Sequence, residues 1–389
     1  MIHKVRSDHT VADSVQQLAT AESPMETLRL TTRDQARALV DCTYDTYGLT
    51  FHRDWVYDAD RVMELNARGD VVSFLAMDGR DVVGHVAMLR PSFDVTDEGC
   101  PITSMACREV GLSMVRPTHQ GQGVQAQISV AMMQYTMQSD IAGTFMKCVT
   151  KHTGSQKGAR RAGGVPTGLM LGSIPRWVCY DDEEQASDQP ISVVQYHITF
   201  RPSEKVLQVP QGFEWLPDVV ANTGTTRLAP PPALVDGDTR LVVKWQGDRK
   251  LAQIYVMEAG RDLVEKLHER IQWLMGGHIA HVLVYMPGDA PAVGAAGPDL
   301  AAAGLSPAGW IPDFFRGRRD AILYQALTHQ KLDVENIRVA GKDAISLAKN
   351  VHSGWQQTRD AQERREAAAA AAGSVVSLDA ARRSRELAS

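Results

Sequence analysis

The feature that most constrains this chain is a pair of glycines, Gly121 and Gly123, in the stretch Val-Arg-Pro-Thr-His-Gln-Gly-Gln-Gly-Val-Gln at residues 115–125. An apolar run, Val110–Val115, precedes the pair. Glycine loses more conformational entropy on folding than other residues, so such a pair indicates a tight turn or a close approach to the backbone. The apolar residues that follow have helical spacing and predict a helix: Val124, Ile128, Ala131, Met132 and Tyr135.

A dinucleotide-binding fold also has glycines between a strand and a helix. That fold requires a third glycine and an acidic residue at the end of the next strand. Position 126 is alanine, and no acidic residue ends the strand expected at Thr144–Val149. The sequence therefore disfavours a dinucleotide site.

Composition and charge exclude several classes of protein. Of the 389 residues, 44% are hydrophobic and 22% are charged, which is typical of a globular protein. The net charge of −5 gives no electrostatic signature for nucleic acid. The five cysteines lack Cys-x-x-Cys spacing, which disfavours a disulfide framework or a metal site. The chain begins without the apolar core of a signal peptide, and no apolar run is long enough to span a bilayer. We expect a cytoplasmic protein that binds no metal, no nucleic acid and no membrane.

Hydrophobic periodicity predicts a regular order of elements in the first half of the chain. A hairpin is expected at Val71–Leu89, because two β-rich runs are separated by Asp-Gly. In chain order the predicted elements are a strand at Leu28–Leu30, a helix ending at Gly48, a helix at Asp58–Ala67, the hairpin, a strand at Glu109–Val115, the helix after Gly123, a strand at Thr144–Val149 and a short helix at Lys151–Gly163.

This order, with Gln-Gly-Gln-Gly-Val-Gln opening the long helix, resembles the GNAT superfamily of CoA-dependent N-acyltransferases. The family signature is Gln/Arg-x-x-Gly-x-Gly/Ala; Gln120 and Gly123 match it, and Gln125 departs from it. Val115-x-Pro117 and the strand Val82–Ala87 also resemble the family. The resemblance covers residues 25–180. It implies an α/β (α+β) fold, in which helices flank a mixed central sheet.

The resemblance implies acetyl-CoA, or another acyl-CoA, as co-substrate. The pyrophosphate would lie on backbone amides at the helix N-terminus, where the macrodipole is positive. The pantetheine arm would pair with the strand that ends at Val115. The binding residues implied in this way are Met114, Val115, Gln120, Gly121, Gln122, Gly123, Val124, Gln125 and Ser155.

Acyl transfer to an amine needs a base, a polarised carbonyl and a proton for the leaving thiolate. Glu109 lies where several GNAT enzymes have a glutamate base; the alternative is a strand-end carboxylate that faces water. The family's usual acid is a tyrosine, which is absent from residues 152–164. The thiolate would then receive its proton from His152, Tyr180 or water. We expect His85 and Cys148 to lie in the core.

The second half of the chain repeats the order of hairpin, helix and strand, from Thr239 to Leu327. At the equivalent junction it reads Met-Glu-Ala-Gly-Arg-Asp, where Glu258 would repel a pyrophosphate. We expect two similar halves: a flexible leader at 1–24, a GNAT domain at 25–180, a degenerate GNAT-like domain at 190–350 and a helical or disordered tail at 351–389. An unrelated α+β domain is the alternative. Either would shape the acceptor site or form the interface of a homodimer.

These features predict an acyl-CoA-dependent N-acyltransferase that acts on an amine of a small molecule or peptide. One alternative is a non-catalytic GNAT-like protein that senses CoA or has a structural role. Another is an acyltransferase whose donor is an acyl carrier protein. A basic patch near the glycines would favour the carrier or would bind the 3′-phosphate of CoA; its candidates are Arg116, Lys151, Lys157, Arg160 and Arg161.

Overall fold

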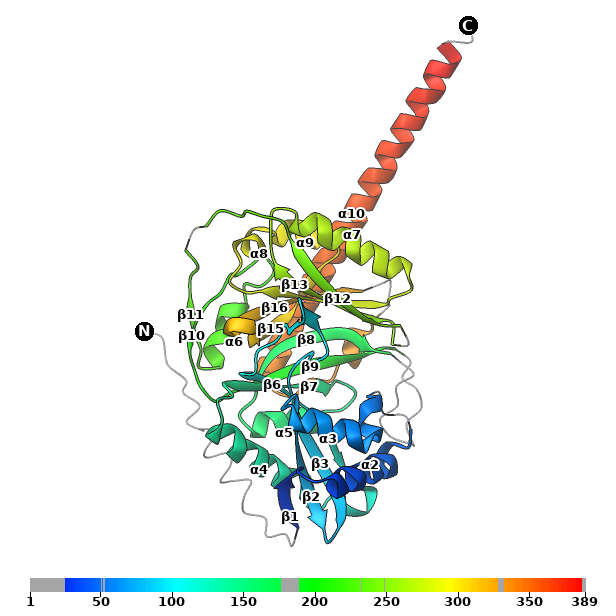
Figure 1. Ribbon diagram of the computed structural model, residues 1–389. Coiled ribbons are helices and arrows are strands. Elements are labelled where there is room, and N and C mark those ends of the chain that lie inside the picture. The colour runs from blue at the N-terminus through cyan, green and yellow to red at the C-terminus, as the bar shows by residue number, and fades with distance from the viewer. Residues whose placement is uncertain are drawn as a thin grey trace.

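The computed structural model describes residues 25–49, 51, 53–175, 189–231, 233–247, 249–327 and 332–386. One mixed sheet of twelve strands runs through these residues in the order β1-β2-β3-β6-β7-β9-β8-β15-β16-β14-β13-β12 (Figure 1). Helices flank the sheet, so the predicted α/β fold class is confirmed. The leader at 1–24 lies outside the described residues.

The first seven positions of the sheet belong to the first half of the chain. All neighbouring strands there are antiparallel except β6 and β7, which are parallel. The strands are β1 (Glu26–Arg29), β2 (Val71–Asp78), β3 (Asp81–Leu89), β6 (Cys107–Val115), β7 (Gly143–Val149), β8 (Val165–Ile174) and β9 (Ile191–Thr199). The short strands β4 (Thr96–Asp97) and β5 (Cys100–Pro101) form a separate pair.

Four helices cover the two faces of this half. Thr32 and Gln35 form a capping box that starts α2 (Arg33–Tyr47). With α3 (Ala59–Ala67), α2 packs on one face of β2 and β3. On the opposite face, α4 (Val124–Gln138) covers β2 and β3, and α5 (Gly154–Arg161) lies beside β7 and β9. The one-turn helices η1 (Asp54–Tyr57) and η2 (Pro117–His119) lie in the connections.

The second half of the sheet repeats the topology of the first. Strands β13 and β14 are parallel, as β6 and β7 are, and the hairpin β15–β16 places its second strand beside β14. Helix α7 (Leu263–Gly276) connects the parallel strands, as α4 does. The strands are β12 (Arg240–Gln246), β13 (Leu251–Glu258), β14 (His281–Pro287), β15 (Ser306–Phe315) and β16 (Arg319–Leu327), with α8 (Pro291–Ala295) and α9 (Gly297–Ala302) between β14 and β15.

The two halves join edge to edge at a pair of glycines. Strand β8 pairs with β15 at Gly168 and Gly309, where a Cβ added to Gly309 would lie 2.5 Å from the Cα of Gly168. Beyond this junction the sheet faces come together around one shared core. That core contains Phe145 of β7 and Tyr285 of β14. The second half therefore covers one face of the first.

The strand pairings beside the expected boundary bear on where the two halves divide. The expected boundary segment, Asp181–Gln189, lies outside the described residues except for Gln189. Strand β9, which we placed in the second domain, pairs with β7 and β8 of the first half. A polar stretch followed by a strand does not show which strands that strand will join. We therefore propose that the division falls after Thr199, where β10 (Glu204–Val206), α6 (Leu216–Asn222) and β11 (Thr226–Leu228) begin the connection to β12.

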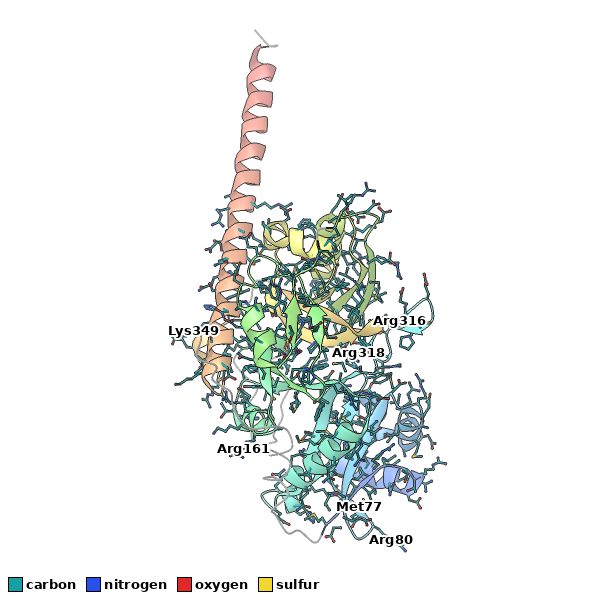
Figure 2. The ribbon with its side chains drawn as sticks, turned by 90° about the vertical axis from the view of Figure 1, so that its left-hand side faces the viewer. Met77, Arg80, Arg161, Arg316, Arg318 and Lys349 are labelled. Atoms are coloured by element: carbon teal, nitrogen blue, oxygen red, sulfur yellow. The ribbon has the colours of Figure 1, made fainter. Side chains whose placement is uncertain are left out.

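The expected tail is part of one long helix, α10 (Lys342–Glu386), whose first turns pack against β8 and β15 (Figure 1). Leu347, Val351 and Trp355 join Leu169 and Tyr196 in a core cluster. In Figure 2, α10 runs along one side of the molecule with Lys349 at its outer edge, and its later turns extend away from the sheet. Among the described helices, none is long and apolar enough to cross a membrane.

Candidate active site

The parallel strands β6 and β7 part from each other after a short stretch of pairing. They pair from Cys107 and Gly143 as far as Val110 and Met146, although both strands continue. Leu112 has a φ of +52°, and the pairing of β6 with β3 shifts register at this point. Such a bulge bends its strand and re-aims the residues beyond it. The bend opens a gap in the middle of the sheet.

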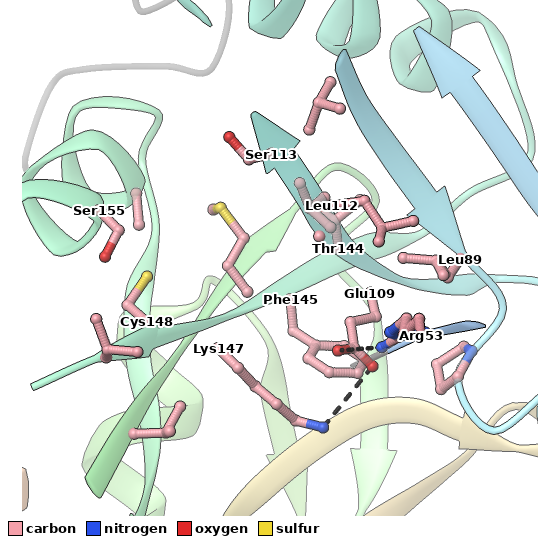
Figure 3. A pocket seen from close by; sticks show the side chains of 18 of the residues that line it. Arg53, Leu89, Glu109, Leu112, Ser113, Thr144, Phe145, Lys147, Cys148 and Ser155 are labelled. Carbon is pink, nitrogen blue, oxygen red and sulfur yellow. Dashed lines mark ion pairs between the residues drawn. The ribbon is translucent and has the colours of Figure 1, made fainter. Parts of the chain in front are cut away.

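A cavity of about 1240 Å³ follows this gap (Figure 3). On one face of the sheet it is lined by Gln125 and Ser129 of α4 and by Ser155 of α5. On the other face it is lined by Arg53 and by Tyr285 of the second half. The cavity therefore reaches both faces of the sheet through the space between β6 and β7.

The loop before α4 has the geometry of an anion site. Gly121 and Gly123 have φ values of +77° and +79°, and a Cβ at either position would meet nothing within 4 Å. Gly123 is the N-cap of α4, and no side chain caps the helix. The first amides of an uncapped helix lack intrahelical partners and favour a negative charge. The side-chain amides of Gln120 and Gln122 donate to the carbonyls of Val115 and Thr118, so they hold the loop in shape.

Gln125, where the sequence departs from the family signature, presents an unsatisfied acceptor. Its Oε1 is buried and has no hydrogen-bond partner among the described residues, and the side chain lines the cavity. A buried polar atom without a partner costs about 1–3 kcal/mol, so a ligand N–H at this position would be favoured. The amides of a pantetheine arm offer such donors. The uncapped helix and the Gln125 oxygen thus both fit the CoA that the resemblance implies.

The other expected binding residues lie in different positions. Met114 is buried against α2, where its sulfur is 3.6 Å from the Thr43 hydroxyl, and Val115 packs on the α4 side. Neither side chain is among those that line the cavity. Ser155 does line it, beside Cys148, in the first turn of α5. If Met114 and Val115 bind the pantetheine arm, they would do so through their backbone.

The basic patch is smaller than the sequence indicates. Arg116 pairs with Asp45 at 2.8 Å, and Arg160 pairs with Asp343 of α10 at 2.6 Å. Both cations are used to hold helices in place. Lys157 is exposed, and Arg161 lines the cavity at the edge of the first half (Figure 2).

Glu109 lies at the point where the strands begin to part, on the face that the second half covers. Its Oε1 is 3.5 Å from Nη2 of Arg53, and its Oε2 is 3.7 Å from Nζ of Lys147 (Figure 3). Burial opposes the charge on Lys147, but the nearby carboxylate of Glu109 holds its pKa above the usual value. The Glu109 side chain is only 16% exposed. A carboxylate between two cations inside a cavity is not the water-facing strand end that was the alternative.

Sequence reasoning missed Arg53 and Lys147. Arg53 precedes a one-turn helix, and Lys147 is a lone cation within an apolar strand. The alternation of side chains along β7 is the one sequence pattern that could have indicated Lys147, because it places Lys147 on the same face of the strand as Phe145. No local pattern distinguishes Arg53 from a surface residue.

His152 lines the cavity just after β7, and its Nδ1 accepts a hydrogen bond of 3.2 Å from the amide of Gly154. This bond orients the ring from inside the α5 loop. Tyr180, the other expected proton donor, lies outside the described residues. Of the two expected proton donors, His152 is therefore the one whose position the structure describes.

Two residues expected in the core are there. His85 is fully buried, and burial lowers its pKa to about 3, so the ring is neutral at ordinary pH. Burial raises the pKa of Cys148 to about 11, against the opposing effect of a hydrogen bond with Ser155. The thiol of Cys148 therefore stays protonated, which argues against a nucleophile.

In the second half, the end of β14 and the N-terminus of α7 are both in contact with other parts of the chain. Leu207 is buried in the core formed by α7 and β14, and a Cβ on Gly288 would lie 2.6 Å from it. At the N-terminus of α7, Asp262 accepts a hydrogen bond from the amide of Thr239 and pairs with Lys266 at 2.9 Å. A carboxylate thus stands where an anionic ligand would have to bind.

No protein-family model and no curated protein matches the sequence. Solved structures match a little under half of the chain. An N-acetyltransferase from Staphylococcus aureus Mu50 is 11% identical, with a TM-score of 0.34 over 45% of this chain and 99% of its own. The ribosomal L7/L12 acetyltransferase RimL, in complex with coenzyme A, is 17% identical, with a TM-score of 0.33 over 46% of this chain and 95% of its own. Mutant forms of the spermidine/spermine N-acetyltransferase SpeG from Vibrio cholerae are 13% identical, with a TM-score of 0.32 over 45% of this chain and 95% of their own. A putative acetyltransferase of the GNAT family from Desulfovibrio desulfuricans is 10% identical, with a TM-score of 0.34 over 45% of this chain and 99% of its own.

Proposed function

We propose that this protein is an acyl-CoA-dependent N-acyltransferase, with acetyl-CoA as the expected donor, and that its active site is the cavity between β6 and β7. The observation that carries the proposal is one continuous cavity with two different ends. Near one end lies the uncapped N-terminus of α4, and at the other lies Glu109. A donor and an acceptor that enter from opposite faces would meet between the parted strands.

In this proposal the acyl thioester supplies the activated carbonyl. The amides after Gly123 hold the pyrophosphate, and the edge of β6 that no longer pairs with β7 beyond Val110 holds the pantetheine amides. Glu109 takes one proton from the ammonium group of the acceptor and passes it to solvent. The nitrogen then forms the C–N bond, the C–S bond breaks, and the second proton of the nitrogen leaves with the thiolate, through His152 or water.

The second half of the chain closes the acceptor side and binds no donor of its own. Its strands face the first half across the shared core, and Asp262 stands at the N-terminus of α7, where the phosphates of a second donor would need to bind. We therefore propose that it descends from a repeat of the same fold and now serves the single active site.

A donor held on a carrier protein has less support. Such a partner would need an exposed basic surface near the α4 loop. Two of the five candidate cations, Arg116 and Arg160, are instead paired with carboxylates of this chain. Free CoA, which needs only the loop and the strand, fits what remains.

Two measurements test the proposal. Acetyl-CoA should raise the unfolding temperature of the full chain. When a mixture of amines is added to the protein and acetyl-CoA, the transfer reaction should release free CoA, whose thiol is measured. Loss of a general base typically lowers the rate by about 10²–10⁴-fold, so Glu109→Gln should lose turnover and keep acetyl-CoA binding. Glu269→Gln, on the exposed side of α7, is the matched control. If acetyl-CoA does not stabilise the protein, the proposal fails.

A further inference from the structure

The acceptor end of the cavity is built by both halves of the chain. Lys244 and Gln253, from β12 and β13, line it together with Glu109. The loop after β3 is tied to these strands: Ser92 shares a 2.6 Å hydrogen bond with Tyr255, and Asp94 forms an ion pair with Lys244. This end is therefore a walled chamber, and a small molecule fits it better than a folded protein surface.

The charges in this chamber are unbalanced around Glu109. Arg53 and Lys147 share its single carboxylate at 3.5 and 3.7 Å. Arg53 precedes a one-turn helix and Lys147 comes from β7, so two cations from separate elements meet at one carboxylate. An acceptor with a negative group would balance them, whereas a polycationic amine would be repelled.

The distances set the spacing of charges that an acceptor needs. Its ammonium group must reach Glu109, and its anionic group must reach Arg53 or Lys147. Since these cations lie within 4 Å of the Glu109 oxygens, the two charges of the acceptor must also lie only a few bonds apart. Aromatic side chains complete the wall: the rings of Trp55 and Phe93 meet edge to face at 6.4 Å. An apolar side chain on the acceptor would pack there.

We propose that the acceptor is a small zwitterionic amine, with an anionic group within two or three bonds of the amino nitrogen, as in an α-amino acid with an apolar side chain. This inference rests on the proposed function and names its substrate class. The anionic group is a carboxylate or a phosphonate, since Arg53 binds either.

The test compares acceptors that differ in one group, with saturating acetyl-CoA and thiol release as the readout. The panel is phenylalanine, its aminophosphonate analogue, phenethylamine, 6-aminohexanoate and spermidine. Hydrogen bonds to charged groups contribute about 1.5–3 kcal/mol, so kcat/KM for phenylalanine should exceed that for phenethylamine by about 10–100-fold. The long spacing of 6-aminohexanoate should make it as poor as phenethylamine. The ratio of carboxylate to phosphonate identifies the anionic group.

Variants at Arg53 test the assigned contact. Arg53→Gln should raise KM for phenylalanine and bring the ratio to phenethylamine close to one, while Arg53→Lys should restore part of the ratio. Arg270→Gln, on the exposed face of α7, should leave the ratio unchanged. The inference is overturned if spermidine or phenethylamine is preferred, or if no anionic amine is either acetylated or bound by the CoA complex. The proposed function fails separately, through the absence of acetyl-CoA binding.

Discussion

Replacing Gly123 by alanine tests the link between backbone geometry and donor binding. At a φ of +79° this residue is left-handed, and a Cβ there would meet no atom within 4 Å. No clash is expected, so the cost is the backbone strain alone, about 1–2 kcal/mol for an L-residue. Gly79, in the β2–β3 turn, has a φ of +61° and equally open surroundings. Gly79→Ala should therefore lower the free energy of unfolding by a similar amount.

The two variants should differ only in the presence of acetyl-CoA. A ligand at 100 times its Kd stabilises the native state by about 2.7 kcal/mol. The relaxed loop and added methyl group of Gly123→Ala disturb the amides that would hold the pyrophosphate. If its Kd rises 100-fold, the same ligand concentration contributes only about 0.4 kcal/mol. Gly79→Ala should keep the full 2.7 kcal/mol, because Gly79 belongs to the β2–β3 turn and does not line the cavity.

The assay is urea unfolding of the full chain and both variants, with and without acetyl-CoA. Equal m-values for all proteins would show that the midpoints report stability. An equal ligand-induced gain in the two variants would refute the assignment of the α4 loop to the donor phosphates. A loss of ligand-induced stability in Gly79→Ala would show that strain alone, and not position, explains the result.

Three further predictions concern stability. Burial lowers the pKa of His197 to about 3, so between pH 6.5 and pH 3 only the unfolded state binds a proton at this residue, and the free energy of unfolding should fall as the pH decreases. In urea titrations, His197→Gln should reduce the slope of the unfolding free energy against pH by about 1.4 kcal/mol per pH unit between pH 6 and 4. An unchanged slope would contradict this. Leu347→Ala should lower the free energy of unfolding by about 2–5 kcal/mol, because the Leu347 side chain is 3% exposed, whereas Ile345→Ala, at 42% exposed, should lower it little. Equal losses would show that α10 does not pack on the sheet as described. Gly84→Ala places a Cβ 2.6 Å from Val124, so calorimetry should show a loss of about 1–3 kcal/mol in the free energy of unfolding and a smaller stabilisation by acetyl-CoA. A variant as stable as the parent, with normal binding, would disprove the close packing of α4 on β3.

The local order of the first half was predictable because its signals are local. The Asp-Gly turn between β2 and β3 and the Thr32 cap of α2 depend on neighbouring residues alone. The glycine pair before α4 is left-handed, as in a tight turn, which is one of the two readings that the sequence left open. Strand β15 was not predicted, because Pro307 and Gly309 read as a loop; Gly309 is required there only by the close approach of β8.

By itself the sequence determined the order of elements from β1 to α5, the turn chemistry and the resemblance that pointed to Glu109 and the α4 loop. Tertiary structure alone decided that β9 inserts between β7 and β8, that the second half covers the acceptor face, and that Arg53 and Lys147 meet at Glu109. The physical reason is one of range. Turns, caps and amphipathic periods are set by residues within a few positions of each other, whereas strand pairing and charge clusters depend on contacts between distant segments, which no local pattern records.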